Sequence, residues 1–435
     1  MKVLFYSYDL LAGDVARRLV QEGHNVKLFI EDKDRRKNFE GLVEKTDDWK
    51  KELSWVGKNG LIVFDSVGYG ALQDDLRSKG YNVFGGSEKG ELLEIDRKHG
   101  QEIFEQYGIT VYPIESFSNY EDAERFLLSN DGPWVLKQND QTTEKDLNYV
   151  GQLSDGQDVL QVLKSYTRIF PPDILFPIYL QKRIDGIEIA CCRFFNGNDW
   201  VGPIELSIEH KKFFPGDVGP NTGEMGTLTQ YTKDENNKLF QLTLAKMTDY
   251  LRSVNYRGVF DINSIVNEQG VFPLEATTRF GCPIVHLQTD FYHHKWGDYL
   301  MAVAKGENYK PKVKSGFGVV LFLVVPPFPY TKKLKEHSSE GVTIYLDKVT
   351  DEEMDRIHFE EVSVRKVNGK NEYYISDSRG YVLYVTAIAD TIEKARTKSL
   401  DLAQKIIIPK VMYRHDIGLK YLSDDENLLK SWGFV

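Results

Sequence analysis

The sequence predicts an α/β chain of composite α+β character that contains more than one domain. In the first 84 residues, short apolar runs suited to buried strands alternate with helix-compatible segments, which is typical of a parallel α/β unit. After residue 178 β-prone runs dominate, and they include a hairpin pattern at residues 259–276. A chain of 435 residues is too long for a single hydrophobic core, so we expect roughly two to four domains.

The N-terminal unit is expected to be a small parallel sheet covered by helices. Its predicted strands are residues 3–7, 25–30, 61–64 and 82–84, and its predicted helices are residues 14–23 and 72–79. The loop after the first strand, residues 7–13, holds one glycine, so we predict no dinucleotide site there. Tyr69 lies between two glycines, a pattern that suits either a ligand loop or a plain turn.

The rest of the chain is expected to form three further parts. A charged helical stretch at residues 88–107 and an extended segment at residues 109–113 lead into a small αβ subdomain, and a spacer at residues 306–315 suggests a later boundary. The other predicted elements are helices at 121–129, 158–166, 237–254 and 392–405 and strands at 134–137, 178–181, 318–325, 342–346 and 382–389. The expected domains are residues 1–113, 114–180, 181–310 and 311–435.

The composition argues against several classes of protein. No segment is apolar over the length needed to cross a bilayer, and no signal-peptide pattern opens the chain, so we expect a cytoplasmic protein. Cys191, Cys192 and Cys282 have neither disulfide nor metal spacing, which fits a reducing compartment. A formal net charge of −10 argues against non-specific nucleic-acid binding. We expect small-molecule partners only, and a monomer or weak homodimer.

Residues 259–281 give the strongest indication of a chemical site. Asp261 and Glu275 lie almost symmetrically about a turn-like Asn-Glu-Gln-Gly, so pairing of the two flanking strands places the carboxylates opposite each other on one face. Their mutual repulsion favours a bound divalent cation, because Mg²⁺ prefers carboxylates, waters and phosphates as ligands. The alternative is that one acid faces solvent, or that a register slip separates the pair.

Two cations near this hairpin suit phosphoryl transfer. Arg279 follows Glu275 closely, with Gly281 just beyond, and can lie beside the proposed metal. Lys137 ends the apolar strand PWVLK, where its ammonium either reaches phosphate oxygens in a cleft or lies in water.

The loop GPNTGEMG, residues 219–226, is a further candidate. Its glycines and proline fix a tight backbone whose N–H groups can form an anion-binding nest, although an ordinary turn has the same composition. His210, Lys211 and Lys212 precede this loop. They either supply positive charge to the same pocket or lie at the solvated surface.

Together these motifs resemble the glycinamide ribonucleotide synthetase family, the phosphoribosylamine–glycine ligases of the ATP-grasp superfamily. GPNTGEMG is similar to the family's GPNTGGMG and follows SIEHKK, where the family has a DHK-type segment, and LEATTRFGCP is similar to EFNxRFGDPE. The C-terminal GYVLYVTAIADTIEKARTKSLDL and RHDIG resemble GRVLxVTAxGxTxxEAxxxAY and RxDIG. The resemblance covers roughly residue 83 to the C-terminus, and the combination of GPNTG with RFG is specific.

The resemblance implies an ATP-grasp fold with an N-terminal Rossmann-like (preATP-grasp) domain, a small lid subdomain, a catalytic core and a small C-terminal β-rich domain. It implies a ligase that phosphorylates a carboxylate with ATP and lets an amine attack the acyl phosphate, with Mg²⁺ or Mn²⁺ as the metal. The implied catalytic residues are Arg279, Lys211 and Asn221; the nucleotide residues are Arg97, Lys137, Gln181 and Glu188; the substrate residues are His210, Gly219, Pro220, Asn221, Thr222 and Gly223; and the metal ligands are Glu275, Asp261 and Thr277.

The chain also departs from the family at several positions. Thr277 stands where the family has the asparagine of EFN, and Asp261 on the preceding strand is our candidate replacement ligand. Gln181 and Lys182 replace two glutamates of the adenine hinge, and QNDQTTEKDLNYVG replaces the family's glycine-rich phosphate loop. In the N-terminal unit, YSYDLLAGD and FDSVGYG stand where the family has the GGREHA and GPE segments that hold phosphoribosylamine.

Three interpretations follow from these observations. The preferred one is an ATP-dependent carboxylate–amine ligase whose amine substrate need not be phosphoribosylamine. The second is an authentic glycinamide ribonucleotide synthetase of purine synthesis, favoured by GPNTG, Arg279 and RHDIG. The third is a non-catalytic nucleotide-binding homologue, suggested by the lost glycine loop and Thr277.

Overall fold

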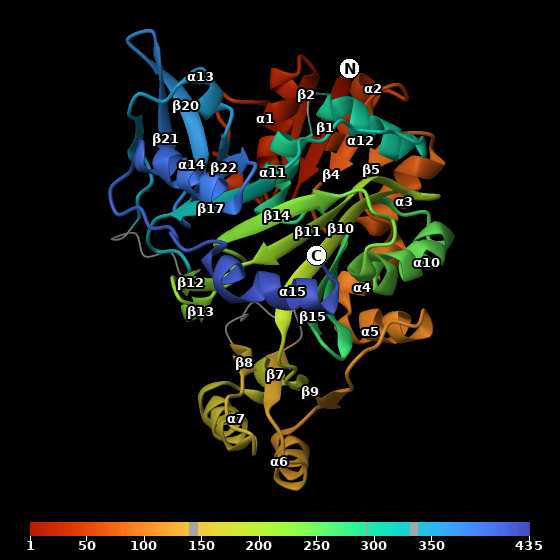
Figure 1. Cartoon of the computed structure of the whole chain (residues 1–435). Helices are drawn as coiled ribbons and strands as arrows, with labels where there is room; N and C mark the ends of the chain where they lie inside the picture. Colours follow the sequence, from red (N-terminus) through yellow and green to blue (C-terminus); the bar gives the residue numbers. More distant parts are fainter. Residues whose placement is uncertain (139–146, 293–294, 331–337) are drawn as a thin grey trace.

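The computed structural model describes residues 1–138, 147–292, 295–330 and 338–435, and its N-terminal unit is a parallel five-stranded sheet (Figure 1). The strand order is β3-β2-β1-β4-β5. The alternating pattern of the sequence predicts a parallel unit of this kind, but neither this order nor β3. The strands are β1 (Lys2–Ser7), β2 (Asn25–Ile30), β3 (Glu44–Thr46), β4 (Leu61–Phe64) and β5 (Asn82–Phe84). The helices up to residue 106 are α1 (Gly13–Gln21), α2 (Trp49–Val56), α3 (Gly70–Ser78), α4 (Glu88–Ile95) and α5 (Arg97–Gln106).

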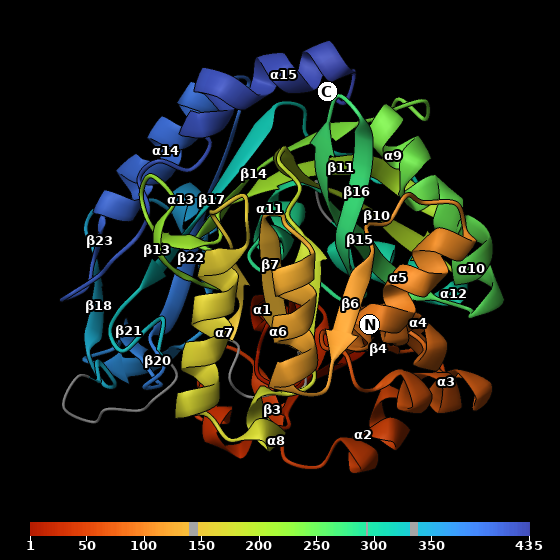
Figure 2. The same cartoon turned by 90° about the horizontal axis from the view of Figure 1, so that it is seen from below.

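A small subdomain projects from one end of the molecule. Its sheet has the order β6-β9-β7-β8, and it has a hydrophobic core of its own. Seen from that end, helices α6 and α7 lie side by side against the sheet (Figure 2). The elements are β6 (Ile114–Phe117), α6 (Tyr120–Ser129), β7 (Trp134–Gln138), β8 (Tyr149–Val150), α7 (Gln157–Ile169), α8 (Pro172–Leu175) and β9 (Ile178–Lys182). The loop that replaces the family's glycine-rich segment lies largely outside the described residues.

An eight-stranded sheet forms the centre of the protein, and every pair of neighbouring strands in it is antiparallel. Its order is β16-β15-β10-β11-β14-β17-β22-β19. The strands are β10 (Ile187–Asn196), β11 (Trp200–Glu209), β14 (Gly226–Thr232), β15 (Arg257–Asn267), β16 (Gly270–Thr277), β17 (Phe317–Val324), β19 (Ile357–Phe359) and β22 (Tyr381–Ala389). Because β17 pairs with β14, the sheet continues past residue 310, where we predict a domain boundary. Strands from both sides of that position therefore belong to one sheet.

The remaining elements cover this sheet or extend from it. The C-terminal strands β18 (Thr343–Leu346), β20 (Val362–Val367), β21 (Lys370–Ile375) and β23 (Ile406–Ile407) form a separate sheet, and β12 (Lys212–Phe214) pairs with β13 (Val218–Asn221). The helices are α9 (Lys238–Leu242), α10 (Thr248–Ser253), α11 (Ile284–Phe291), α12 (Trp296–Lys305), α13 (Asp351–Met354), α14 (Ile392–Gln404) and α15 (Glu426–Trp432). No helix among the described residues is long and apolar enough to cross a membrane.

The predicted helix at 88–107 and the predicted helix at 237–254 are both interrupted. Asp96 ends α4 in an extended conformation, and its side chain accepts a hydrogen bond from the amide of His99 to begin α5. Thr243 has φ −124° and ψ −93°, which separates α9 from a short 3₁₀ turn before α10. The predicted extended segment at 109–113 forms no strand; pairing begins at β6.

The predicted hairpin forms, but its register differs from our expectation. Asp261 pairs with Thr277, and Asn263 pairs with Glu275, because a β-bulge between Asn263 and Ser264 shifts the ladder. The prediction that Asp261 and Glu275 lie directly opposite each other is therefore wrong. They are diagonal neighbours on one face, since paired residues and residues two apart on a strand share a face.

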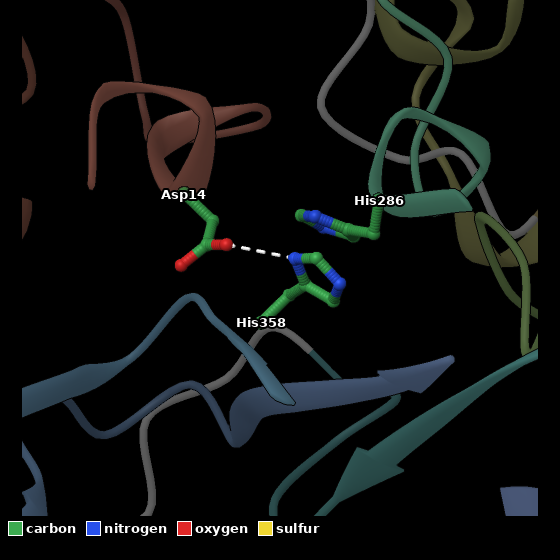
Figure 3. Close-up of side chains that lie close together, drawn as sticks. All are labelled: Asp14, His286 and His358. Carbon is green, nitrogen blue, oxygen red and sulfur yellow. Dashed lines mark hydrogen bonds and ion pairs between the residues drawn. The ribbon is translucent and has the colours of Figure 1, made fainter. Parts of the chain in front are cut away.

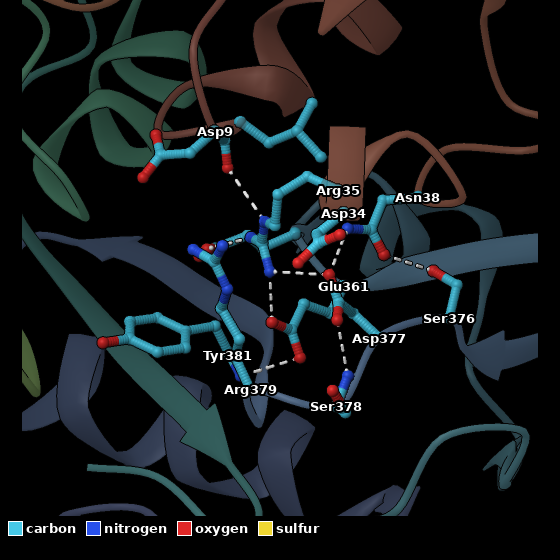
Figure 4. Close-up of polar contacts among 12 residues, drawn as sticks. Asp9, Asp34, Arg35, Asn38, Glu361, Ser376, Asp377, Ser378, Arg379 and Tyr381 are labelled. Carbon is cyan, nitrogen blue, oxygen red and sulfur yellow. Dashed lines mark hydrogen bonds and ion pairs between the residues drawn. The ribbon is translucent and has the colours of Figure 1, made fainter. Parts of the chain in front are cut away.

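A buried arginine joins the N-terminal unit to the C-terminal part (Figure 4). Arg35 is 1% exposed and pairs with Glu360 at 3.0 Å, with Asp377 at 3.1 Å and closely with Glu361. Its Nε also donates to the main-chain carbonyl of Asp9 at 3.2 Å. Burial raises the pKa of Glu361 to about 7, and the positive charge of Arg35 opposes this rise. The ionised form of Glu361, and with it the ion pair, therefore depends on the guanidinium of Arg35.

Arg35→Gln is expected to destabilise the protein by about 3–5 kcal/mol, because it leaves buried carboxylates without their partner. Urea unfolding of the variant would measure this loss. Arg125→Gln is the matched control, since the Arg125 side chain is 75% exposed in its pair with Asp122 and should change stability by less than about 1 kcal/mol. Equal effects of the two substitutions would contradict the role given to Arg35.

A histidine lies between two carboxylates at the same interface, and Figure 3 shows its contact with one of them, Asp14. His358 on β19 places Nδ1 2.8 Å from Asp14 of α1 and Nε2 3.4 Å from Asp290 of α11. Burial opposes protonation of His358, but the two carboxylates outweigh it and hold the pKa of His358 above its ordinary value. The neighbouring His286 stays neutral, because burial lowers its pKa to about 3. The His358 imidazolium therefore links three elements from distant parts of the sequence.

The cations around these two acids come from both sides of the interface. Arg17 pairs with Asp14 at 2.6 Å, and Arg356 lies 3.9 Å from Asp290. The hydroxyl of Thr386 donates to Asp290 as well. Burial alone would raise the pKa of Asp14 and of Asp290, but these partners stabilise the ionised carboxylates. The pKa of each acid therefore lies below its ordinary value.

His358→Gln is expected to cost more stability in acid than in base. A group whose pKa is raised by folding stabilises fully below its unfolded pKa, here 6.5, and this contribution is lost as the pH rises through the folded pKa. The difference in unfolding free energy between wild type and variant should therefore be largest below pH 6.5 and shrink as the pH rises above it in urea titrations. The exposed His415 offers a control in His415→Gln. A difference that does not change with pH would contradict a charged His358.

Candidate active site

One large cavity, of about 1450 Å³, lies where the N-terminal unit, the central sheet and the C-terminal part meet. The N-terminal unit contributes Asp9 and Tyr69 to its wall, and the central sheet contributes Glu188 and Glu275. A third side is formed by residues 208–223. Cavities of this size, with polar groups converging from several elements, are the usual form of small-molecule sites.

The floor of the cavity is one polar face of the antiparallel sheet. Register places Glu188 of β10, Glu209 of β11 and Asn263 of β15 on this face, with Glu275 of β16 opposite Asn263. The Asn263 amide nitrogen donates to Glu188 at 2.8 Å and to Glu209 at 3.0 Å. Four adjacent strands therefore bring their polar side chains together.

Lys211 provides the positive charge at the centre of this group. Its Nζ lies 2.6 Å from Glu188, 3.4 Å from Glu209 and 3.7 Å from Glu275. Burial works against the charged lysine, but the three carboxylates hold the pKa of Lys211 well above its ordinary value. For Glu275, Lys211 and Arg97 overcome the effect of burial and lower the pKa to about 2. Lys211 and Glu275 are thus both charged at neutral pH.

The site nevertheless carries more acid than its own cations neutralise. Burial and neighbouring carboxylates raise the pKa of Asp261 and Glu224 well above ordinary values. Asp261 Oδ1 and Asn263 Oδ1 are buried without a hydrogen-bond partner among the described residues. Oxygen donors and uncompensated negative charge are what Mg²⁺ and Mn²⁺ require. The residues present therefore fit a hard divalent cation, with Glu275 and Thr277 on the cavity wall and Asp261 beside them on the same face of the sheet.

The predicted nucleotide residues fall into two pairs. Arg97 and Glu188 line the cavity, and Arg97 pairs with Glu275 at 3.3 Å. The Lys137 ammonium donates to Gln181 Oε1 at 2.6 Å across β7 and β9 of the small subdomain. Gln181 is 4% exposed, so this hydrogen bond lies at the interior of the small subdomain.

Arg279 reaches the cavity from the segment that follows β16. Its Nε pairs with Glu94 of α4 at 2.9 Å, and its Nη1 donates to the main-chain carbonyl of Phe280 at 3.0 Å. Within the described residues its Nη2 has no hydrogen-bond partner, so this end of the guanidinium remains available to a ligand. Glu94 therefore fixes the orientation of Arg279 without enclosing it.

The GPNTGEMG loop is built differently from a simple anion-binding nest. The amide of Thr222 donates to the carbonyl of Lys211 at 2.8 Å, and the amide of Met225 donates to the carbonyl of His210 at 2.8 Å. Asn221, Thr222 and Gly223 line the cavity, whereas Gly219 and Pro220 are absent from its described lining. The loop thus offers side chains and a few free amides rather than a complete ring of N–H donors.

The expectation that His210 supplies positive charge is wrong. Burial lowers the pKa of His210 to about 4, and its Nε2 accepts a hydrogen bond from the amide of Gly418 at 3.1 Å. The neutral ring therefore carries its proton on Nδ1, which is buried without a partner in the described structure. The RHDIG segment supports the same loop, since Arg414 pairs with Asp217 at 2.8 Å and donates to the carbonyl of Lys212 at 3.0 Å.

Sequence reasoning missed several polar residues of the site: Glu94, Glu209, Glu224 and Asn263. A signal for two of them was present. In the apolar strand PIELSIE, the polar residues Glu205, Ser207 and Glu209 recur at every second position, and Asp261 and Asn263 do so in FDIN. This period places them on one face of a buried sheet, where polar side chains need a function or a partner.

The sequence of this chain is similar to the sequences of known proteins. Residues 95–284 match the family model described as phosphoribosylglycinamide synthetase, ATP-grasp (A) domain. A phosphoribosylamine–glycine ligase of Listeria monocytogenes serotype 4b (strain F2365) is 27% identical over 408 residues, covering 87% of this chain and 89% of that protein. The one from Methanobrevibacter smithii is 26% identical over 365 residues, covering 80% of this chain and 79% of that protein.

Solved structures agree in fold. The crystal structure of phosphoribosylamine–glycine ligase from Thermotoga maritima has a TM-score of 0.74 at 18% identity. The match covers 96% of this chain and 100% of that chain. A biotin carboxylase from Campylobacter jejuni has a TM-score of 0.63 at 11% identity, covering 99% of this chain and 98% of that one. These matches confirm the predicted ATP-grasp fold and the predicted resemblance.

Proposed function

We propose that this chain, whose residues 95–284 form an ATP-grasp domain of the phosphoribosylglycinamide synthetase family, is an ATP-dependent ligase that joins a carboxylate to an amine. The observation that supports this most is the arrangement around Lys211, with three carboxylates within 3.7 Å of its ammonium and Arg97 and Arg279 on the same cavity wall. Such a combination of fixed cations and metal-binding acids suits the transfer of a phosphoryl group.

The proposed reaction has two balanced steps. First, an oxygen of the substrate carboxylate takes the γ-phosphoryl group of ATP, and ADP leaves. Second, the amine nitrogen attacks the acyl carbon, loses a proton and displaces phosphate, which leaves an amide. A divalent cation held by the acids of this site would offset the negative charge of the phosphates.

The residues of this chain would hold the reacting groups and offset charge. In this proposal Arg97 and Lys211 would approach phosphate oxygens, and Nη2 of Arg279 would approach the transferred phosphoryl group. Glu275, Asp261 and Thr277 would hold the metal. Lys137 and Gln181 would serve the nucleotide through the small subdomain, and Asn221, Thr222 and the Nδ1 proton of His210 would orient the carboxylate substrate.

The second candidate is an authentic glycinamide ribonucleotide synthetase, favoured by curated relatives of that activity over 80% or more of this chain. Only with that amine would the reaction belong to purine synthesis. A cytoplasmic location and a monomer or weak homodimer belong to the proposal in either case. The division into residues 1–113, 114–180, 181–310 and 311–435 remains a prediction.

Turnover can be tested by ADP release with Mg·ATP, glycine and freshly generated phosphoribosylamine, omitting each component in turn. The ligase proposal expects ADP release that requires a carboxylate and an amine together. Release with all three named components would support the second candidate. If no ADP is released with glycine and phosphoribosylamine, the assay is repeated with panels of other carboxylates and amines. Nucleotide binding without ADP release in any of these assays would indicate a non-catalytic nucleotide-binding protein.

Arg279→Met is expected to reduce kcat by about 10²–10³-fold, the usual cost of removing one donor that stabilises charge in a transition state. Nucleotide affinity should change little, because other cations line the same wall. Arg252→Met is the matched control, since Arg252 is 46% exposed and pairs with Asp249 on the surface helix α10. A variant at Arg279 with wild-type kcat would remove this residue from phosphoryl transfer.

Asp261→Asn is expected to weaken Mn²⁺ binding in the presence of ADP by about 10–100-fold, as for other residues that support a metal. Because Asp261 holds a proton when no cation is near, the neutral amide should preserve the fold of the metal-free protein. Titration followed by electron paramagnetic resonance measures the affinity. Glu268→Gln in the exposed turn of the same hairpin is the control. Unchanged Mn²⁺ affinity would show that Asp261 is not a ligand.

A further inference from the structure

We propose that the amine substrate carries a second cationic group in place of a phosphate, and that Asp9 and Glu31 bind this group. The inference rests on the proposed ligase function and names the class of its amine. It comes from the part of the cavity wall formed by the first 90 residues, here called the N-terminal wall. That wall includes Asp9, Glu31, Tyr8 and Tyr69, and it contains no lysine, arginine or histidine.

Three main-chain amides at the helix starts beside this wall already donate to acids of the chain. The amides of Gly68 and Tyr69, at the start of α3, donate to Glu91 at 2.8 and 3.1 Å. At the start of α1, the amide of Ala12 donates to Asp65 at 3.1 Å. Both acids belong to the chain and are buried, at 7% and 0% exposure. Carboxylates of the protein therefore stand at the two helix N-termini where an anionic ligand would otherwise bind.

Two cations of the interface are committed to other acids. Arg35 is enclosed by Glu360, Glu361 and Asp377, and Arg379 pairs with Asp32 at 2.6 Å. A phosphate on the N-terminal wall would thus meet carboxylates, and this wall has no cation of its own to compensate them. Like charges placed together repel, so the wall selects against a phosphorylated amine.

The same wall offers two carboxylates to a cation. Asp9 has no side-chain hydrogen bond or ion pair within the described residues; its main-chain carbonyl is held by Arg35, and its carboxylate points away from that cluster (Figure 4). Glu31 uses Oε2 to accept the hydroxyls of Tyr6 and Tyr69, the latter at 2.9 Å. Its Oε1 has no partner in the described structure, so both acids can accept N–H donors from a ligand.

Aromatic rings complete the site. Tyr8 is 48% exposed next to Asp9, and Tyr69 lies beside Glu31. An ammonium or guanidinium near tyrosine rings is attracted by the ring electrons in addition to its ion pairs. The chemistry therefore fits a diamine or a guanidino amine, whose second cationic group binds here while the reacting nitrogen extends toward Arg279 and Lys211.

The experiment measures binding of matched amines by calorimetry, with Mg²⁺ and a non-hydrolysable ATP analogue present. The probes are α,ω-diaminoalkanes of two to five carbons, 4-aminobutylguanidine, the monoamines of equal length and the ω-aminoalkyl phosphates of equal length. At least one dication should bind tenfold or more tightly than its monoamine, and the phosphates should bind most weakly. Tighter binding of any phosphate than of its matched dication, or no preference for dications, would overturn the proposal.

Two variants locate the selectivity. Asp9→Asn and Glu31→Gln should each reduce the preference for the dication over the monoamine by about tenfold, the loss of one charge-assisted contact. Asp47→Asn, at a side chain 90% exposed and outside the cavity lining, should keep the wild-type preference. A preference that survives both cavity variants would place the cationic group elsewhere and contradict the assignment.

A separate assay keeps this inference distinct from the ligase proposal. Wild-type protein is incubated with Mg·ATP, glycine or another carboxylate, and hydroxylamine, which converts an acyl phosphate into a hydroxamate. Hydroxamate formation with the wrong amine selectivity would refute only the inference. Selective binding of dications without hydroxamate from any carboxylate would refute the ligase proposal and leave the amine site standing.

Discussion

The acids gathered on one face of the central sheet are the constraint on which the site depends. Glu188, Glu209 and Glu275 reach this face from separate strands, and among the described residues only the ammonium of Lys211 lies within 3.7 Å of all three. Like charges placed together repel, so the sheet can hold these acids in ionised form only with a cation in place. The lysine satisfies part of this requirement. The remaining acid makes the site receptive to a divalent cation and to the phosphates that accompany it.

The cavity exists because distant segments are held together around this face. Arg35 joins the N-terminal unit to the strands near residues 360–377, and His358 joins α1 to α11 and β19. Both contacts use charges enclosed in the interior, where removing one partner is more expensive than at the surface. Arg35 also holds the main chain of Asp9. The interface that builds the fold thus also fixes one wall of the amine site.

Much of the fold could be predicted from local patterns. The parallel unit, the hairpin and the helix α14 follow from periodicity over short windows, and the motif resemblance identified the ATP-grasp architecture. The continuity of the sheet from β14 through β17 to β22 could not be predicted, because these strands lie far apart in sequence. The bulge beside Asn263 could not be predicted either, since a single extra residue leaves no compositional mark. Without it, the ladder from the turn would pair Asp261 with Ala276; with it, Asp261 pairs with Thr277 and lies diagonal to Glu275 on the same face.

The residues of the site also divide into those that motifs predict and those whose role depends on contacts formed only in the folded chain. Glu275, Lys211 and Arg279 were expected from motifs and line one cavity. The charge of His210 was misjudged, because its burial depends on contacts with residues near 418. The occupation of helix N-termini by Asp65 and Glu91 was also invisible in the sequence, because each acid caps a loop formed by other residues. These caps distinguish this N-terminal wall from a phosphate site, although the central sheet retains the polar arrangement expected of the family.

The central claim is that phosphate passes from ATP to a carboxylate before the amine reacts. Positional isotope exchange tests it most directly, using ATP labelled with ¹⁸O in the β–γ bridge, a carboxylate and no amine. The account predicts that the label scrambles into the non-bridging β-phosphoryl positions only when a carboxylate is present, because acyl phosphate and ADP form reversibly in the closed site. Amide synthesis in the complete reaction without any such scrambling, under conditions where bound ADP can rotate, would contradict it.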